Sequence, residues 1–212
     1  MIKLICLFLL SCLSITAFAQ KGDAEQNAPT KKIILFNGKN LEGWEGNTTI
    51  WRVHRGTIVG GNKKDTIAQN EFLSTTSSYK NFDLEVKFKI KGYGGFINAG
   101  IQFHSQRLNN PPNEMAGYQA DIGEGCMGSL YDESRRDKYL VKADQGKVTL
   151  KKGWNRYKIS SRGNTITLWI NDKETLTYSE QDATIPLSGK IGLQIHGGGI
   201  LEIFYKDVVL TY

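Results

Sequence analysis

The sequence predicts an all-β protein, a jelly-roll β-sandwich of two antiparallel sheets. From Ile33 onward, short segments rich in Ile, Val, Phe, Tyr, Trp and Thr are separated by Gly, Asn and Asp at intervals of about ten residues. No window shows a sustained helical repeat of apolar residues, so helices covering a parallel sheet are not expected. Two short connections, Gly163-Asn164 and Asn171-Asp172, contain residues that tolerate positive φ in hairpin turns.

The expected strands follow one another within a single domain spanning residues 31–212. In chain order they lie in WRVHRGTIVG (51–60), NFDLEVKFKI (81–90), NAGIQFH (98–104), GYQADIG (117–123), the long segment 155–178, KIGLQIHG (190–197) and ILEIFYKDVVLTY (200–212). Two connections, about 105–116 and about 123–152, exceed hairpin length. They are expected to be long loops, where functional residues often lie.

The first residues predict export. Residues 1–19 have one early lysine, an apolar run and the small-x-small sequence Ala17-Phe18-Ala19, which is typical of a signal peptide cleaved near Ala19. Residues 20–30 are polar and aperiodic and are expected to be flexible. No later segment approaches the roughly 18 apolar residues of a membrane span, so the mature chain is expected in the periplasm or at the cell surface, without a membrane segment.

The chain has a modest excess of basic residues over acidic ones and a formal net charge of +6 at pH 7. Basic residues are interspersed with acids along the sequence, and Lys151-Lys152 stand alone in a turn. A nucleic-acid-binding protein would concentrate its basic residues on one face together with exposed aromatic residues. Nucleic acid is therefore not an expected partner.

Alternation along the strands sorts polar residues onto one side. Successive side chains of a strand point to opposite faces, and in four expected strands the apolar residues share one parity. The other parity carries Glu85, Lys87, Gln102, His104, Gln119, Asp121, Gln194 and His196. Glutamine and histidine can both donate and accept hydrogen bonds, which suits sugar hydroxyls. If the four strands are neighbours in one curved sheet, these residues line a single concave cleft.

The segment after the strand 117–123 is expected to close over the rim of that cleft. Gly123, Gly125 and Gly128 would allow a tight loop near a ligand. Tyr131 can stack on a sugar face and donate from its hydroxyl group. Arg135 and Arg136 can either bind sugar hydroxyls or hold a neighbouring acid, and a glycine-rich connector with surface ion pairs is the alternative interpretation.

Several motifs together resemble the 3-keto-disaccharide hydrolase family, whose members are also described as 3-keto-glucoside 1,2-lyases and 3-keto-2-hydroxy-glucal hydratases. They are LFNGKNLEGW (35–44), WRVHRGTIVG, FLSTTSSYKNFDLEVKFKI (72–90), NAGIQFHS, GYQADIG with GSLYDESRR, GWNRYKI and GKIGLQIHGGGILEIFYKDVVL. The resemblance implies a concanavalin-like jelly roll and an exported enzyme. Its substrate would be a glycoside whose 3-hydroxyl group a partner sugar 3-dehydrogenase has oxidised to a ketone. This chain departs from the family pattern at Asn98-Ala99-Gly100, where Asn-Ser-Gly is usual, and at His104, where arginine is common.

Such chemistry requires a base for the hydrogen on C2, an acid for the leaving oxygen and donors for an enolate oxygen. His104 or Asp121 is predicted as the base, and Glu85 or His196 as the acid. The predicted substrate-binding residues are Lys87, Gln102, Gln119, Glu124, Tyr131, Arg135 and Gln194. No cofactor is expected. A divalent metal held by His104, Asp121, Glu85 and His196 is the alternative, although no close motif such as His-x-x-x-His supports it.

Three other functions use the same features. A lectin-like carbohydrate-binding module would share the fold and the residues that bind hydroxyl groups. A conventional glycosidase would need two carboxyl groups about 5 to 5.5 Å or about 6.5 to 9.5 Å apart, for which Glu85 with Asp121 or Glu124 are candidates. A structural protein of the cell envelope is the third alternative.

Overall fold

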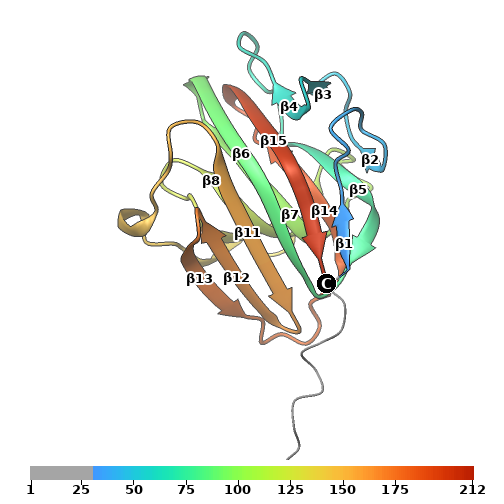
Figure 1. Cartoon of the computed structure of the whole chain (residues 1–212), viewed down its shortest axis with the longest axis vertical. Coiled ribbons are helices and arrows are strands. Elements are labelled where there is room, and N and C mark those ends of the chain that lie inside the picture. The colour runs from blue at the N-terminus through green and yellow to red at the C-terminus, as the bar shows by residue number, and fades with distance from the viewer. Residues whose placement is uncertain (1–30) are drawn as a thin grey trace, which may run out of the picture.

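The computed structural model describes residues 31–212, which form a sandwich of two antiparallel sheets (Figure 1). The predicted signal peptide and the segment 20–30 lie outside these residues. The strands are β1 (Lys32–Ile34), β2 (Trp44–Glu45), β3 (Trp51–His54), β4 (Thr57–Gly61), β5 (Glu71–Tyr79), β6 (Phe82–Gly95), β7 (Asn98–Arg107), β8 (Met115–Gly123), β9 (Leu130–Glu133), β10 (Lys138–Val141), β11 (Asn155–Arg162), β12 (Thr165–Ile170), β13 (Lys173–Ser179), β14 (Gly189–Ile195) and β15 (Gly199–Thr211). One short 3₁₀ turn spans Gln145–Lys147.

The two sheets take strands from distant parts of the chain. The first sheet has the order β13-β12-β11-β6-β15-β4-β3, and β1 also pairs with β15. The second sheet has the order β10-β9-β8-β7-β14-β5-β2. In Figure 1 the first sheet faces the viewer and the second lies behind it. This arrangement confirms the predicted jelly-roll sandwich of antiparallel sheets.

The core lies between the sheets and follows the predicted alternation. On β6, Phe82, Leu84, Val86 and Phe88 are buried, while the residues between them are at least partly exposed. The facing strands of the second sheet contribute, among others, Ile101, Phe103, Tyr118, Ala120, Ile122, Ile191, Leu193 and Ile195. Each large apolar side chain that leaves water stabilises the fold by roughly 1.5 to 3 kcal/mol. The one free cysteine of the described residues, Cys126, is buried.

Both predicted hairpin turns are present. Gly163-Asn164 joins β11 to β12, and Asn171-Asp172 joins β12 to β13. Asn171 has a φ of 51° and Asp172 a φ of 70°, the left-handed values that such two-residue turns require. These turns place β11, β12 and β13 side by side at one end of the first sheet.

The prediction of one long loop over 123–152 is wrong. This segment contains β9 and β10, which extend the second sheet beyond β8. Both strands have only four residues, which is too short for alternation to be recognised in the sequence. Within residues 31–212, no helix is long and apolar enough to cross a membrane.

Candidate active site

Three of the four strands expected to share the cleft are neighbours in the second sheet, in the order β8-β7-β14. Gln102 of β7 pairs across the ladder with Gln119 of β8 and with Gly192 of β14. The glycines on this outer face leave room for their neighbours, because a Cβ atom on Gly100 would lie 2.6 Å from the side chain of Gln119. The sheet therefore has a hollow outer face with amides on its floor.

A chain of hydrogen bonds runs across this floor. Ser105 Oγ donates to Gln102 Oε1, and Gln102 Nε2 donates to Gln119 Oε1 at 3.2 Å. Gln119 Nε2 in turn donates to Asp121 Oδ1 at 2.9 Å. These residues are almost fully buried, so this series of hydrogen bonds fixes the rotamer of each amide and the orientation of the Asp121 carboxyl group at its end.

A cavity of about 250 Å³ lies over this part of the sheet. It is lined by Phe96, Asn98, Gln119, Asp121, Tyr131, Glu133, Tyr139 and His196. These residues come from β7, β8, β9 and β10 and from the segments that flank β7 and β14. Pockets for drug-sized ligands measure about 300 to 1,000 Å³, so this cavity suits a single small ring. We refer to it as the sheet cavity.

The carboxyl group of Asp121 is held near its titration point. Burial raises the pKa of Asp121 to about 7, against the opposing effect of hydrogen bonds from Gln119, Tyr139 and Cys126. A carboxyl group in this range exchanges a proton readily near neutral pH. Asp121 can therefore act as a base or as an acid.

Glu133 of β9 is a second carboxyl group of the same kind. Burial raises its pKa to about 7, and the neighbouring charges of Glu114, Asp121 and Asp137 add to the effect. Gln194 Nε2 donates to Glu133 Oε2 at 3.1 Å, which orients the group from the β14 side. Two carboxyl groups that repel each other and titrate near neutral pH are thus part of one cavity wall.

His196 follows β14 and forms another part of the wall. Its Nδ1 lies 2.7 Å from the carbonyl oxygen of Gly197. A carbonyl oxygen can only accept, so Nδ1 carries a proton and donates to it, which leaves Nε2 as the ring nitrogen available to a ligand. The ring of Phe96 packs against the imidazole edge to face, with centroids 4.8 Å apart, and Phe96 itself is 53% exposed. The cavity therefore offers a third proton-transfer group beside an exposed aromatic surface.

Tyr131 and Tyr139 supply hydroxyl donors. Their rings pack edge to face with centroids 5.0 Å apart. Burial raises the pKa of both hydroxyl groups, and nearby carboxylates contribute, among them Glu133 at Tyr131 and Asp121 at Tyr139. Both groups therefore remain protonated and can donate hydrogen bonds near neutral pH.

The expectation that His104 faces the cleft is wrong. A β-bulge shifts the register between Phe103 and Gln106, and His104 takes a φ of 47°. This irregularity reverses the alternation, so His104 lies between the sheets, with its ring centroid 5.4 Å from that of Phe82 and its Nε2 3.4 Å from Ser161 Oγ. Burial, with the nearby charges of Arg135 and Lys80, lowers the pKa of His104 to about 4.

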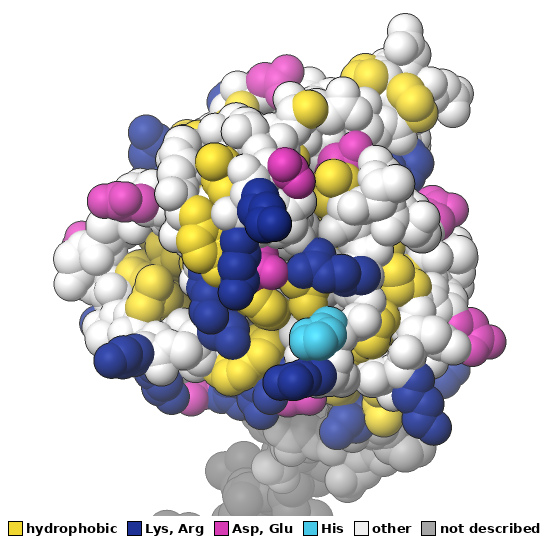
Figure 2. All heavy atoms as spheres, turned by 90° about the horizontal axis from the view of Figure 1, so that it is seen from above, with side chains coloured by type: hydrophobic (Ala, Val, Ile, Leu, Met, Phe, Trp, Pro, Cys, Tyr) yellow, Lys and Arg dark blue, Asp and Glu magenta, His cyan; other side chains and the backbone are white. Residues whose placement is uncertain are grey.

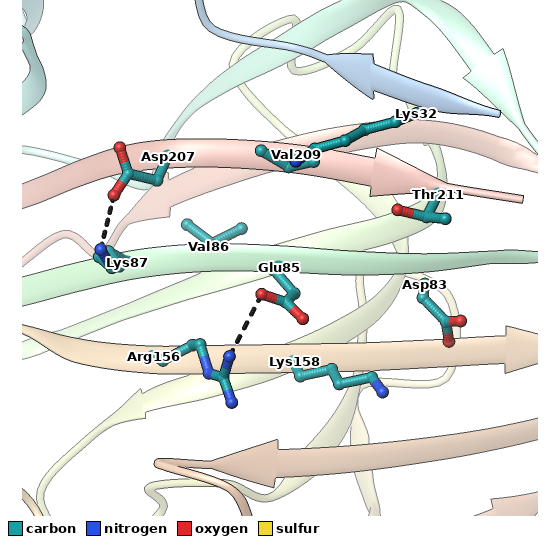
Figure 3. Close-up of a pocket in the computed structure, with 10 residues that line it drawn as sticks. All are labelled: Lys32, Asp83, Glu85, Val86, Lys87, Arg156, Lys158, Asp207, Val209 and Thr211. Carbon is teal, nitrogen blue, oxygen red and sulfur yellow. Dashed lines mark hydrogen bonds and ion pairs between the residues drawn. The ribbon is translucent and has the colours of Figure 1, made fainter. Parts of the chain in front are cut away.

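Glu85 and Lys87 are also misplaced by the prediction, because β6 belongs to the first sheet. Both lie on the outer face of that sheet, where they line a separate hollow of about 490 Å³. Figure 3 shows Glu85 directed toward Arg156, with Nη1 and Oε2 3.4 Å apart, and Lys87 directed toward Asp207, at 2.8 Å. Because these ion pairs are partly exposed, they contribute little to the stability of the fold, and this face is a solvated surface.

Arg135 and Glu124 lie outside the sheet cavity as well. Arg135 donates from Nε to Asp132 Oδ1 at 2.8 Å, and its guanidinium group lies 4.6 Å from the ring centre of Tyr118. Of the two roles predicted for Arg135 and Arg136, these contacts support the one in which the arginines hold a neighbouring acid. Glu124 is exposed and lines a neighbouring, mainly apolar hollow with Ile97 and Met127.

Four residues of the sheet cavity are not predicted by strand alternation, namely Phe96, Asn98, Glu133 and Tyr139. Glu133 and Tyr139 reach it on β9 and β10, which were expected to be loop. The pairing of Asn98 with Gly123 across β7 and β8 is a long-range contact without a local sequence signal. Within residues 31–212, no three His, Cys, Asp or Glu side chains come together in a group that could hold a metal ion.

Comparison with solved structures finds the same fold in carbohydrate-related proteins. A protein of Parabacteroides distasonis, provisionally named a glycosyl hydrolase, is 21% identical with a TM-score of 0.62, over 84% of this chain and 92% of that one. Carbohydrate binding module CBM66 of Bacillus subtilis is 15% identical with a TM-score of 0.59, over 78% and 93% of the chains. The β-glucanase of Bacillus licheniformis is 13% identical with a TM-score of 0.53, over 88% and 99%.

These likenesses show the fold alone, and none of the curated proteins compared with the chain matches it. The family is shown by a separate match. Residues 31–211, nearly all of the described structure, match the family described as 3-keto-alpha-glucoside-1,2-lyase-like domain. The chain belongs to this carbohydrate-active family.

Proposed function

We propose that this protein cleaves glycosides that carry a ketone at C3, by elimination of the aglycone followed by hydration. The observation that carries the proposal is the pair of buried carboxyl groups, Asp121 and Glu133, with pKa values near 7 in the wall of one cavity. The family match supports the substrate class. The leader-like sequence of residues 1–19 supports action after export, downstream of a sugar 3-dehydrogenase.

In the proposed reaction, a ketone at C3 acidifies the hydrogen on C2. Asp121 takes this proton, and the electron pair of the C–H bond forms an enolate whose negative charge lies on the C3 oxygen. In this proposal the hydroxyl groups of Tyr131 and Tyr139, which line the same cavity, donate hydrogen bonds to that oxygen. Each group that transfers a proton in the transition state contributes about 10²- to 10⁴-fold to the rate.

The enolate then expels the glycosidic oxygen from C1, and Glu133 or His196 gives that oxygen a proton. The product is a C1–C2 alkene conjugated to the ketone. Water then adds across the C1–C2 double bond, which gives C1 a hydroxyl group and C2 a proton. The sum of the elimination and the hydration is hydrolysis. Side chains of this chain supply every proton transfer, and the proposal requires no cofactor.

Incubation with a 3-keto-glucoside in D₂O tests this function. Elimination and hydration introduce one solvent deuterium at C2 of the released 3-keto-glucose, which NMR detects after subtraction of exchange in a protein-free sample. A conventional glycosidase would release sugar without deuterium at C2 and would also cleave unoxidised glycosides. A lectin-like module would return the substrate intact. Either of these results would exclude the proposed reaction.

A further inference from the structure

The outer face of the first sheet carries a feature that the proposed reaction does not use. Two adjoining hollows, of about 390 and 330 Å³, share Lys151 and Asn155. We call them together the lysine groove. Its basic lining residues are Lys87, Lys89, Lys91, Lys151, Lys152, Arg156 and Lys206, and Asp172 is the one acid among the described residues that line it.

The groove concentrates the charge of the protein. Lys87 pairs with Asp207, and Arg156 pairs with Glu85 and Asp172. The other five basic residues of the groove form no salt bridge within residues 31–212, and they are Lys89, Lys91, Lys151, Lys152 and Lys206. Figure 2, which looks at the molecule from above the view of Figure 1, shows several Lys and Arg side chains near the middle of that end, with hydrophobic side chains between them. Basic residues that are interspersed with acids along the sequence come together here, because β6 and the segment 150–154 line the same hollow.

Strand geometry spaces the lysines regularly. Lys87, Lys89 and Lys91 alternate on β6 and project from the same face, about 7 Å apart along the strand. On the paired strand β15, Lys206 lies opposite Lys87 and Phe204 opposite Lys89. The result is a row of lysines at a regular spacing along an open surface, in which Lys87 is paired with Asp207 and Lys89 and Lys91 form no salt bridge within the described residues.

Aromatic rings hold part of this row in place. Lys89 Nζ lies 5.0 Å from the ring centre of Trp154 and 4.6 Å from that of Phe204. Lys206 Nζ lies 4.5 Å from the ring centre of Trp154. Cation–π contacts orient the ammonium groups but do not neutralise their charge, whereas a carboxylate partner would. Both lysines therefore keep their charge available to an anion.

We propose that the lysine groove binds a linear acidic glycan through its carboxylate or sulfate groups. The proposal is independent of the proposed reaction, which uses the other sheet. Single-stranded nucleic acid is disfavoured because its bases stack on free aromatic faces, whereas lysines cover Trp154 and Phe204. A membrane surface is disfavoured because these two aromatic side chains are half-buried and do not protrude.

Binding of defined polymers by the full protein tests the proposal. The probes are polygalacturonate, dextran sulfate and neutral dextran of matched length, with single-stranded DNA and anionic phospholipid vesicles for comparison. We expect calorimetric titration at low salt to show binding of both acidic glycans, no binding of dextran, and steep weakening with added salt. No binding of either acidic glycan, or tighter binding of DNA or vesicles, would overturn the proposal.

A matched pair of variants locates the binding site. Lys89→Gln, Lys91→Gln and Lys206→Gln together remove three charges from the groove, and Lys39→Gln, Lys63→Gln and Lys64→Gln together remove three from exposed positions outside it. The first triple is expected to weaken glycan binding at least tenfold and the control less than twofold. If the first triple does not fold, Lys151→Gln with Lys152→Gln, in an exposed segment, replaces it. Equal losses in the groove and control variants would contradict the proposal.

Discussion

At the scale of single residues, burial has opposite consequences for acids and for histidine. It raises the pKa values of Asp121 and Glu133 into the neutral range, because the charged form of a carboxyl group loses its hydration. The same loss lowers the pKa of His104 to about 4, so its ring stays neutral. The first two groups can exchange protons with a ligand in the sheet cavity, whereas His104 is enclosed between the sheets.

Asp121→Asn is expected to lose activity and to gain stability. The amide cannot take the C2 proton, so turnover of a 3-keto-glucoside should fall by about 10²- to 10⁴-fold. The wild-type carboxyl group has a folded-state pKa above its unfolded value, so the folded state is penalised as pH rises from about 4 to about 7. The variant lacks this penalty and should be more stable at pH 8 by on the order of 2 to 4 kcal/mol.

Denaturant unfolding at pH 8 and pH 4 checks this prediction. The difference in unfolding free energy between variant and wild type should be present at pH 8 and nearly absent at pH 4. A variant that is less stable than wild type at both pH values would show that Asp121 has a structural role in its charged form.

His104→Ala is expected to behave in the opposite way. Removal of a ring packed against Phe82, Phe103 and Tyr118 leaves a cavity in the core, which costs about 2 to 4 kcal/mol. The side chain does not reach the sheet cavity, so kcat for a 3-keto-glucoside should stay within about threefold of wild type. Thermal melting and steady-state kinetics on one preparation measure both effects. A hundredfold loss of kcat with unchanged melting would restore His104 to the mechanism.

At the scale of elements, an ionic cluster fixes β9, which carries Glu133. Arg135 and Arg136 both donate to the buried carboxylate of Asp132, and Arg136 Nη2 donates to Glu180 Oε2 at 2.7 Å. Burial alone would raise the pKa of Glu180, but hydrogen bonds from Arg136 and Tyr118 outweigh it and lower the pKa to about 2. The segment after β13 is thereby tied to the turn between β9 and β10.

Glu180→Gln is expected to loosen this turn. Loss of one partner of a buried charge pair destabilises by about 3 to 5 kcal/mol, and amide exchange in 130–141 should become faster. Activity should fall because Glu133 and Tyr139 lose their positions. Glu174→Gln, on the exposed face of β13, is the control and should change neither quantity. Unchanged exchange in 130–141 would show that the cluster does not hold β9.

The sequence is sufficient for most of the longer strands and their inward-facing residues, because burial of one face imposes alternation that a single segment displays, but not for the four-residue strands β9 and β10. The sequence does not reveal which sheet each strand joins, so the predicted cleft wrongly includes Glu85 and Lys87 of β6. Alternation also fails at a bulge, and nothing local marks Phe103-His104 as one. The predicted outward placement of Gln102, Gln119, Asp121 and Gln194 is confirmed, because their strands are adjacent and these four positions lie outside the irregular parts of the ladders.

At the scale of the whole molecule, the two sheets present different chemistry on their outer faces. The second sheet has a small cavity with titratable carboxyl groups and hydroxyl donors. The first sheet is an open surface with ion pairs and the lysine groove. The core between them buries the inward faces of both sheets, so a change on one outer face should leave the other intact.

The measurement that tests the account most directly compares Glu133→Gln with Glu85→Gln. Both changes remove one carboxyl group, the first in the sheet cavity and the second on the opposite sheet. With a 3-keto-glucoside as substrate, kcat/KM is expected to fall at least about a hundredfold in Glu133→Gln and to stay within about twofold in Glu85→Gln. A full rate in Glu133→Gln together with a large loss in Glu85→Gln would place the active site on the other sheet and contradict the account.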